Sequence, residues 1–203
     1  MAFPNCYSVG ITSLGYQVIW STLAKRNDVD VRRIFTDQKE TPHKTTDLFG
    51  ISLSWELDGP VLLDLLEQQN IPLWNHQRDN EDPIVFGGGP VLTANPEPFA
   101  PFLDVVLLGD GENLLPLFIE KLLENRQLNR SEQLQALAQM EGIYIPSLYS
   151  PEYNHSGELI SIEPINSNIP ASIKKQTWEG NKLSYSKVIT PEAAWPNIHM
   201  VEV

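Results

Sequence analysis

Short apolar runs alternate with segments of helical period from residue 11 to about residue 140. The strand candidates are VDVRRIF at 29–35, DLFGISLS at 47–54, IPLW at 71–74, PIVFGGG at 83–89 and DVVLLGDG at 104–111. Residues 13–25, 112–125 and 131–140, and a segment that begins at Asp58, carry apolar side chains at helical spacing. This alternation predicts a parallel sheet with helices on both faces.

The predicted fold class is therefore α/β, a doubly wound, flavodoxin- or Rossmann-like parallel sheet that occupies residues 1–141. Such a sheet needs a strand before the first helix, and only MAFP is available for it. Thr12 or Ser13 is the expected N-cap of the first helix, and Asp58 that of the second, with Pro60 in its first turn.

After Gly142 the pattern changes, and residues 142–203 are expected to form a second region. IYIPSLY and ELISIEP flank a polar turn and predict a β-hairpin, and residues 166–197 read as an extended arm rich in polar residues and proline. The final NIHMVEV is strand-like and has no predicted partner in the arm. We expect it to be loosely held or to pair with the hairpin.

Composition excludes several classes of function. The chain has 203 residues and a net charge of -12, and without a basic run it would repel a nucleic-acid backbone. No apolar run approaches the 18 or so residues of a membrane span, and no signal peptide is visible. The single cysteine, Cys6, rules out an internal disulfide and favours the cytoplasm.

Ligands of open α/β sheets bind at the carboxyl ends of the strands, which here are residues 5–10, 52–57, 87–90 and 109–112. Gly87, Gly88 and Gly89 either let a flat ligand approach the backbone or form a tight turn. Asp110 and Glu112 would repel a phosphate. They are expected to cap the following helix or to accept hydrogen bonds from a neutral polar ligand.

Metal chemistry within this chain has little support in the sequence. One cysteine cannot hold an iron–sulfur cluster, and Cys6 is more readily interpreted as structural. The histidines have no spacing typical of a metal site; they are His43, His76, His155 and His199.

Several segments, in order and spacing, resemble the N-terminal region of radical S-adenosylmethionine (radical SAM) proteins, which carries a cobalamin-binding-like domain ahead of the catalytic barrel. These segments are PNCYSVGITSLGYQVIW, GISLSWEL, GGGPVLTANPEPFAPFLDVVLLGDGE, GIYIPSLY and the final HMVEV. The resemblance covers about residues 4–150 and the last seven residues, and the stretch from the three glycines to GDGE is its most specific part.

The resemblance implies that HMVEV opens the barrel and that a Cys-x-x-x-Cys-x-x-Cys loop follows it. That loop binds the [4Fe-4S] cluster that cleaves S-adenosylmethionine. We expect this chain to be a non-catalytic front part whose partner is its own C-terminal barrel, and the reading frame to continue beyond Val203 with those three cysteines. Cluster and S-adenosylmethionine would be held only there.

Cobalamin domains with a lower histidine ligand carry Asp-x-His-x-x-Gly, then Ser-x-Leu, then Gly-Gly. The matching positions here are Asn5, Tyr7 and Gly10, then Ser52 with Ser54 in place of leucine, then Gly87 and Gly88. A neutral phenol is a poor cobalt ligand, so any bound cobalamin should lack a histidine ligand from the protein. The cofactor-binding candidates are Asn5, Tyr7, Gly10, Ser52, Gly87, Gly88, Gly89 and Glu112.

Two other functions remain open. The domain could be an interaction or lid module that shields the barrel and binds no small cofactor. It could also be a flavodoxin-like carrier, although the Ser-, Thr- and Gly-rich phosphate loop of flavodoxins is not matched by NCYSVG.

Overall fold

The structure is a computed structural model of the chain, and it describes residues 1–41, 45–180 and 183–202. His43 and Val203 lie outside these residues. The described strands are β1 (Leu48–Ser52), β2 (Ile84–Gly88), β3 (Val105–Leu107), β4 (Ile143–Tyr144), β5 (Tyr149–Tyr153) and β6 (Leu159–Pro164). The described α-helices are α1 (Tyr7–Gly10), α2 (Leu14–Ala24), α3 (Gly59–Gln68), α4 (Pro90–Ala94), α5 (Gly111–Glu124) and α6 (Arg130–Leu137).

The main sheet has the order β1-β2-β3-β4, with the first three strands parallel and β4 antiparallel to β3. Single parallel bridges join Ala2 to Ile34 and to Ile51. The start of the chain therefore lies between the Ile34 segment and β1. Counted along the chain, the segments lie in the order second, first, third, fourth, fifth, as in flavodoxin-like sheets. The predicted α/β fold is confirmed.

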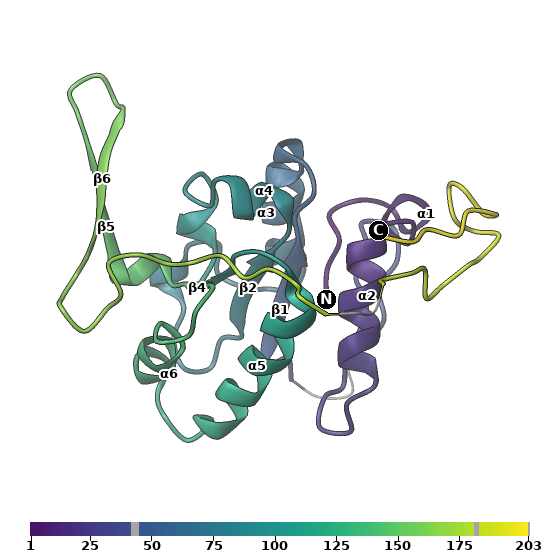
Figure 1. Cartoon of the computed structure of the whole chain (residues 1–203), viewed down its shortest axis with the longest axis horizontal. Helices are drawn as coiled ribbons and strands as arrows, with labels where there is room; N and C mark the ends of the chain where they lie inside the picture. Colours follow the sequence, from purple (N-terminus) through teal and green to yellow (C-terminus); the bar gives the residue numbers. More distant parts are fainter. Residues whose placement is uncertain (42–44, 181–182, 203) are drawn as a thin grey trace.

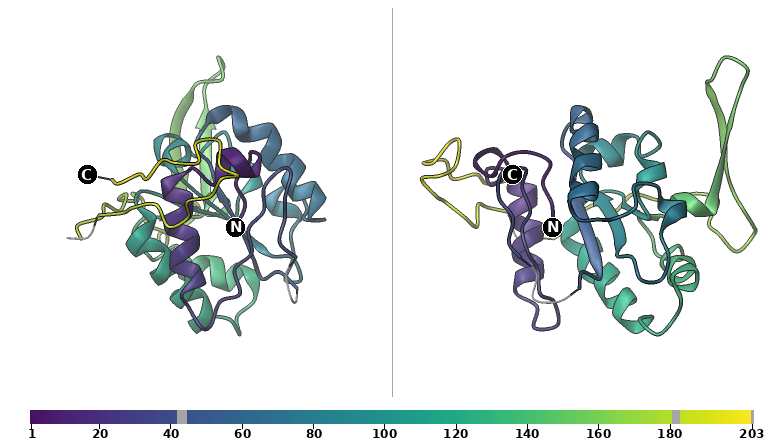
Figure 2. Two further views of the ribbon diagram at one scale, coloured as in Figure 1. Left: turned by 90° about the vertical axis from the view of Figure 1, so that its right-hand side faces the viewer. Right: turned by 180° about the vertical axis from the view of Figure 1, so that it is seen from behind.

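Helices cover both faces of this sheet (Figures 1 and 2). Phe86 of β2 packs on Phe118 of α5, with ring centroids 5.1 Å apart. The neighbouring Gly87 faces the opposite way, because a side chain there would meet Leu92 of α4. On the α5 face, Ile19 of α2 lies against the start of α5 at Gly111.

Some predicted strands do not form. In 29–35 only Ile34 takes part in bridges, to Ala2 and to Lys39. Residues 71–74 are not a strand, because the buried guanidinium of Arg78 donates hydrogen bonds to the carbonyl groups of Pro72 and Leu73. The prediction for the last residues was also wrong: Val201 bridges Tyr185 of the arm, so that segment does have a partner there.

The hairpin is confirmed, but with different boundaries. Ile143 and Tyr144, which the sequence assigned to the hairpin, join the main sheet as β4 beyond the expected limit of residue 141. The hairpin itself consists of β5 and β6. It projects from one end of the molecule, and the arm then runs back across the body toward α1 and α2 (Figure 1).

Helix starts follow local hydrogen bonding. Ser13 caps α2 as predicted, by accepting from the backbone N–H of Tyr16. Asp58 stands at the N-cap position of α3 as predicted, but its side chain makes no capping hydrogen bond. Helix α6 begins with a reciprocal capping box between Asn129 and Glu132.

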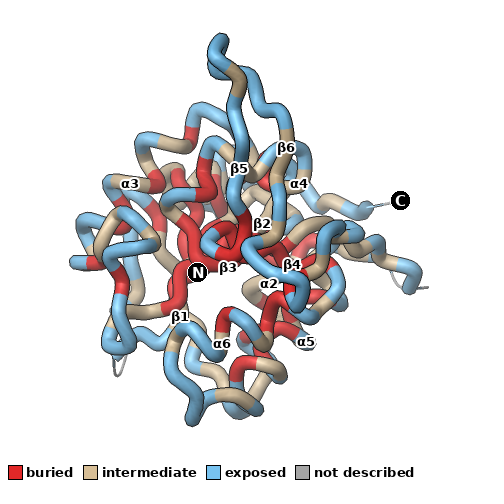
Figure 3. The backbone as a smooth tube through the Cα atoms, turned by 90° about the vertical axis from the view of Figure 1, so that its left-hand side faces the viewer, coloured by how far each residue is buried: buried red, intermediate tan, exposed pale blue. Residues whose placement is uncertain are grey.

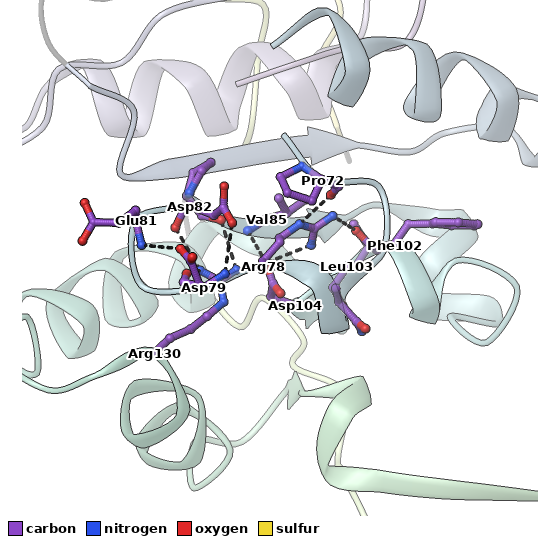
Figure 4. Close-up of polar contacts among 12 residues, drawn as sticks. Pro72, Arg78, Asp79, Glu81, Asp82, Val85, Phe102, Leu103, Asp104 and Arg130 are labelled. Carbon is purple, nitrogen blue, oxygen red and sulfur yellow. Dashed lines mark hydrogen bonds and ion pairs between the residues drawn. The ribbon is translucent and has the colours of Figure 1, made fainter. Parts of the chain in front are cut away.

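One buried carboxylate fixes the amino ends of the strands (Figure 4). Asp104 Oδ2, just before β3, accepts from Arg78 at 3.0 Å, from Arg130 at 2.6 Å and from the backbone N–H of Val85 at 2.7 Å. The Arg78 side chain is fully buried, and burial lowers its pKa while Asp104 opposes that shift. The two guanidinium groups also bind the backbone carbonyls of Pro72, Leu73, Asp79, Asp82, Pro83 and Phe102.

We predict that Asp104→Asn lowers the free energy of unfolding by about 3–5 kcal/mol, because two arginines then lose their buried counter-charge. Urea denaturation of the purified chain measures this. The matched control is Glu124→Gln, which removes an exposed pair with Lys121 and should cost less than about 1 kcal/mol. Equal stability of Asp104→Asn and the native chain would show that this carboxylate does not anchor the strands.

Candidate functional site

The candidate site is the carboxyl edge of the sheet, defined here as residues 5–10, 52–58, 87–90 and 109–112. The reversal of strand order lies between the Ala2 segment and β1, which bridge each other directly. Ligands of open α/β sheets bind at such a reversal. The structure therefore brings the loops after these two segments next to each other.

The three consecutive glycines have three different environments. A side chain at Gly87 would collide with Leu92 and Leu103 in the core. Gly89 has φ +119°, and a side chain there would meet the backbone of Leu53. Core packing and turn geometry therefore require Gly87 and Gly89 without any ligand. At Gly88 an added Cβ would make only ordinary contacts with Leu107, at 3.7 Å or more.

The loop after the first segment is fixed by contacts within the protein. Asn5 Oδ1 accepts from the N–H of Cys6, and Gly10 has no room for a side chain beside Phe3 and Phe35. Tyr7 begins α1 and packs edge-on against Phe35, with ring centroids 5.1 Å apart. Tyr7 is thus engaged with an aromatic cluster rather than with a cluster of metal-ligating side chains.

The loop after β1 combines exposed apolar side chains with one buried charge. Ser52 is half-buried, and its N–H donates to Ala2. Trp55 is 68% exposed and Leu57 is 87% exposed. Asp58 follows them, is only 8% exposed, and its Oδ2 has no hydrogen-bond partner among the described residues. Sequence reasoning gave Asp58 a capping role and so missed this unsatisfied oxygen.

Burial raises the pKa of Asp58, and a hydrogen bond from the backbone of Trp55 opposes that shift. An ionisable group held at a cost in stability is a marker of functional positions. Asp58 is therefore the most informative polar residue of the edge.

The GDGE segment binds the arm of the same chain. Asp110 Oδ2 accepts from the N–H of Trp178 at 2.7 Å, and Glu112 accepts from the Ser184 hydroxyl at 3.1 Å. Gly109 has φ +103°, and its α-carbon lies so close to Gln176 that a side chain would collide with that residue's backbone. Neither carboxylate makes a side-chain cap for α5.

Gln17 of α2 is a second attachment point for the arm, and the sequence gave no sign of it. Its side chain is 2% exposed. The Oε1 atom accepts from the N–H groups of Lys187 and Val188, and Nε2 donates to the carbonyls of Ile11 and Val188. The arm is thus bound across the α2 and α5 side of the carboxyl edge.

Two cavities are described away from the β1 loop. One of about 380 Å³ lies along the outer side of α5, between Leu117, Met140 and Gln176. A smaller one of about 110 Å³ lies where the arm crosses Ile11 and Gln17. Within the described ranges, no three His, Cys, Asp or Glu side chains form a group that could hold a metal ion. In the same residues, no helix has the length and apolar character needed to cross a membrane.

Comparison with known proteins identifies the family. Residues 15–146 match the model for the N-terminal region of radical SAM proteins, which is more than half of the chain. The chain belongs to this family. The hairpin and the arm lie outside the matched residues.

An uncharacterized protein of Methanocaldococcus jannaschii is 27% identical over 110 residues, which is 54% of this chain and 23% of that protein. This chain therefore spans only a small part of that relative. No solved structure gives a significant match.

The edge fits a bound cobalamin only in part. The open side of Gly88 and the unsatisfied oxygen of Asp58 leave groups that a ligand could use. Tyr7 packs on Phe35 and Glu112 holds Ser184, so these two candidates are already occupied. The edge supplies no histidine to a metal, since none occurs in its four segments.

We predict that Asp58→Asn raises the free energy of unfolding at pH 7 by about 1–2 kcal/mol, since an amide carries no charge to desolvate. The folded-state pKa is raised, so the cost of the native carboxylate is present at neutral pH. That cost disappears as the pH falls below the unfolded value of about 3.9. Urea titrations at pH 7 and pH 3.5 should show the gain at the first pH only; a loss of stability at pH 7 would mean that Asp58 has a stabilising partner.

Proposed function

We propose that this chain is the non-catalytic N-terminal domain of a radical SAM protein, in which it covers an adjoining barrel that binds the [4Fe-4S] cluster and S-adenosylmethionine. The family match carries this proposal. The described residues hold no group of metal ligands of their own. The cluster would therefore belong to a separate part of the protein.

A covering role agrees with the contacts at the carboxyl edge. Gln17, Asp110 and Glu112 all accept hydrogen bonds from the arm. The arm also passes so close to Gly109 that a side chain there would collide with it. These three side chains are thereby satisfied within the chain. A surface of this kind suits a domain that shields a neighbour from water more than one that binds a charged small ligand.

Iron–sulfur reconstitution tests whether the proposed barrel, rather than this chain, binds the cluster. Under anaerobic conditions with iron and sulfide, this chain should form no stoichiometric cluster, because Cys6 is its only cysteine. The protein that includes the proposed barrel should form one [4Fe-4S] cluster per chain. Iron analysis and the brown iron–sulfur absorption measure both proteins. A stable cluster of four irons on the present chain would contradict the proposal.

A second candidate function is cobalamin binding at the edge, with no histidine ligand from the protein. Gly88 and Asp58 are the observations in its favour, because neither core packing nor turn geometry requires glycine at Gly88, and Asp58 Oδ2 is an unsatisfied acceptor. Trp55 and Leu57 add exposed apolar surface on the same loop. The family carries cobalamin-binding-like domains, but the fold alone does not establish the ligand.

Retention of hydroxocobalamin separates the two candidates. If the cofactor binds, its spectrum should show no histidine-ligated form, and Gly88→Val should abolish retention by filling the open space. The control is Gly15→Val on the exposed side of α2, where an added side chain meets nothing within 4 Å. No retention by the native chain favours the covering role alone, and equal retention by Gly88→Val would place the site elsewhere.

A further inference from the structure

The β5–β6 hairpin projects from the body, and its strands pair only with each other in a two-stranded sheet (Figures 1 and 3). Its base is well anchored. Tyr149 stacks near Tyr144 and donates its hydroxyl to the carbonyl of Pro170 at 2.7 Å. Beyond the base, the residues from Ser150 to Ile160 are almost all exposed. The hairpin is thus held in a fixed direction but is uncovered along most of its length.

The two faces of the hairpin differ in chemistry. Cross-strand partners share a face, and side chains alternate along each strand. The pairs Ser150–Glu163 and Glu152–Ser161 form a polar face. The apolar face consists of Tyr149, Pro151, Tyr153, Leu159, Ile162 and Pro164, by the register Tyr149–Pro164, Pro151–Ile162 and Tyr153–Leu159.

The base of the apolar face packs on the body through Tyr149 and Ile162, but its outer part is uncovered. Tyr153 is 56% exposed and Leu159 is 46% exposed, and Ile160 at the register shift is 64% exposed. An isolated two-stranded hairpin is marginally stable in water, and unpaired strand edges invite pairing with another chain. This hairpin has exposed apolar side chains and unpaired strand edges on an anchored base, and such a surface favours contact with a partner.

Charge and size decide between partners. The ionisable side chains of the hairpin are Glu152, Glu158 and Glu163 together with Tyr149, Tyr153 and His155. The chain as a whole has a net charge of -12. A second copy or an anionic membrane surface would therefore be repelled. One face of a short hairpin is also far smaller than the roughly 800 Å² per partner that a stable free complex buries.

A small surface is sufficient when the partner is joined to it by the same polypeptide. Tethering raises the effective concentration to about the millimolar range, so a few apolar contacts can hold the two parts together. In the Methanocaldococcus relative, 77% of the chain lies outside the match (100 minus 23), so a large covalent neighbour exists there.

We propose that the apolar face of the β5–β6 hairpin docks onto the catalytic part of the same radical SAM polypeptide, on an apolar surface bordered by Lys or Arg. This inference rests on the proposed function, because that function supplies the covalent neighbour. The docked hairpin then fixes the orientation of the domain relative to the barrel. The polar face, with Glu152 and Glu163, stays exposed to solvent.

Hydrogen exchange measured by mass spectrometry tests the docking in two proteins, the present chain and the full-length protein with its catalytic part. Backbone amides of residues 150–163 should exchange at least about tenfold more slowly in the full-length protein. The double variant Tyr153→Ser, Ile160→Ser should remove that protection. Both side chains are exposed, so the core of the domain is unaffected.

The matched control is Ser150→Ala, Ser161→Ala on the polar face, which should keep the protection in the full-length protein. Equal exchange in the two proteins would overturn the proposal, and so would protection of the present chain that rises with its own concentration, since that indicates self-association. Iron content of the same full-length protein is measured separately. Hairpin protection without a cluster would refute the radical SAM function while leaving the docking intact.

Discussion

The arrangement of the domain depends on the single carboxylate oxygen of Asp104. It accepts hydrogen bonds from two guanidinium groups and one backbone N–H. The same guanidinium groups bind carbonyls of the α3–β2 and α4–β3 connections. Each partner is buried or nearly so, which makes the cluster costly unless every bond is formed. The amino ends of β2 and β3 and the start of α6 are therefore fixed relative to one another. The opposite ends of the strands are free to carry loops of varied chemistry.

Those loops show two different uses of the carboxyl edge. On the side of α2 and α5, buried or charged side chains hold the arm, and close passage of the arm determines Gly109. On the side of β1, apolar side chains are exposed around a buried carboxylate that lacks a partner. The first side is closed by the chain itself. The second side is where a cofactor or a neighbouring domain would make contact.

Sequence reasoning predicted the parts of this structure that follow from local rules. Period and capping predicted α2, α3, α5 and α6, and continuous apolar runs predicted β1, β2 and β3. It failed where a distant group decides the conformation. In residues 71–74, the carbonyl groups of Pro72 and Leu73 accept hydrogen bonds from Arg78. Ile143 and Tyr144 pair with β3 rather than with the hairpin. At the candidate site, the glycines could be located but not explained, because Gly87 depends on Leu92 and Gly89 on Leu53. The roles of Gln17 and Asp58 depend on tertiary contacts, which no sequence motif predicts.

The chain belongs to the family of N-terminal regions of radical SAM proteins, and the proposed function assigns the cluster chemistry to a separate catalytic part. The most direct test is to sequence the gene downstream of Val203. If the proposed function is right, the reading frame continues with three cysteines in Cys-x-x-x-Cys-x-x-Cys spacing within about ten residues, which is where the family resemblance implies the cluster loop. A stop codon directly after Val203, or a continuation without those cysteines, would contradict the assignment of this domain to a radical SAM enzyme.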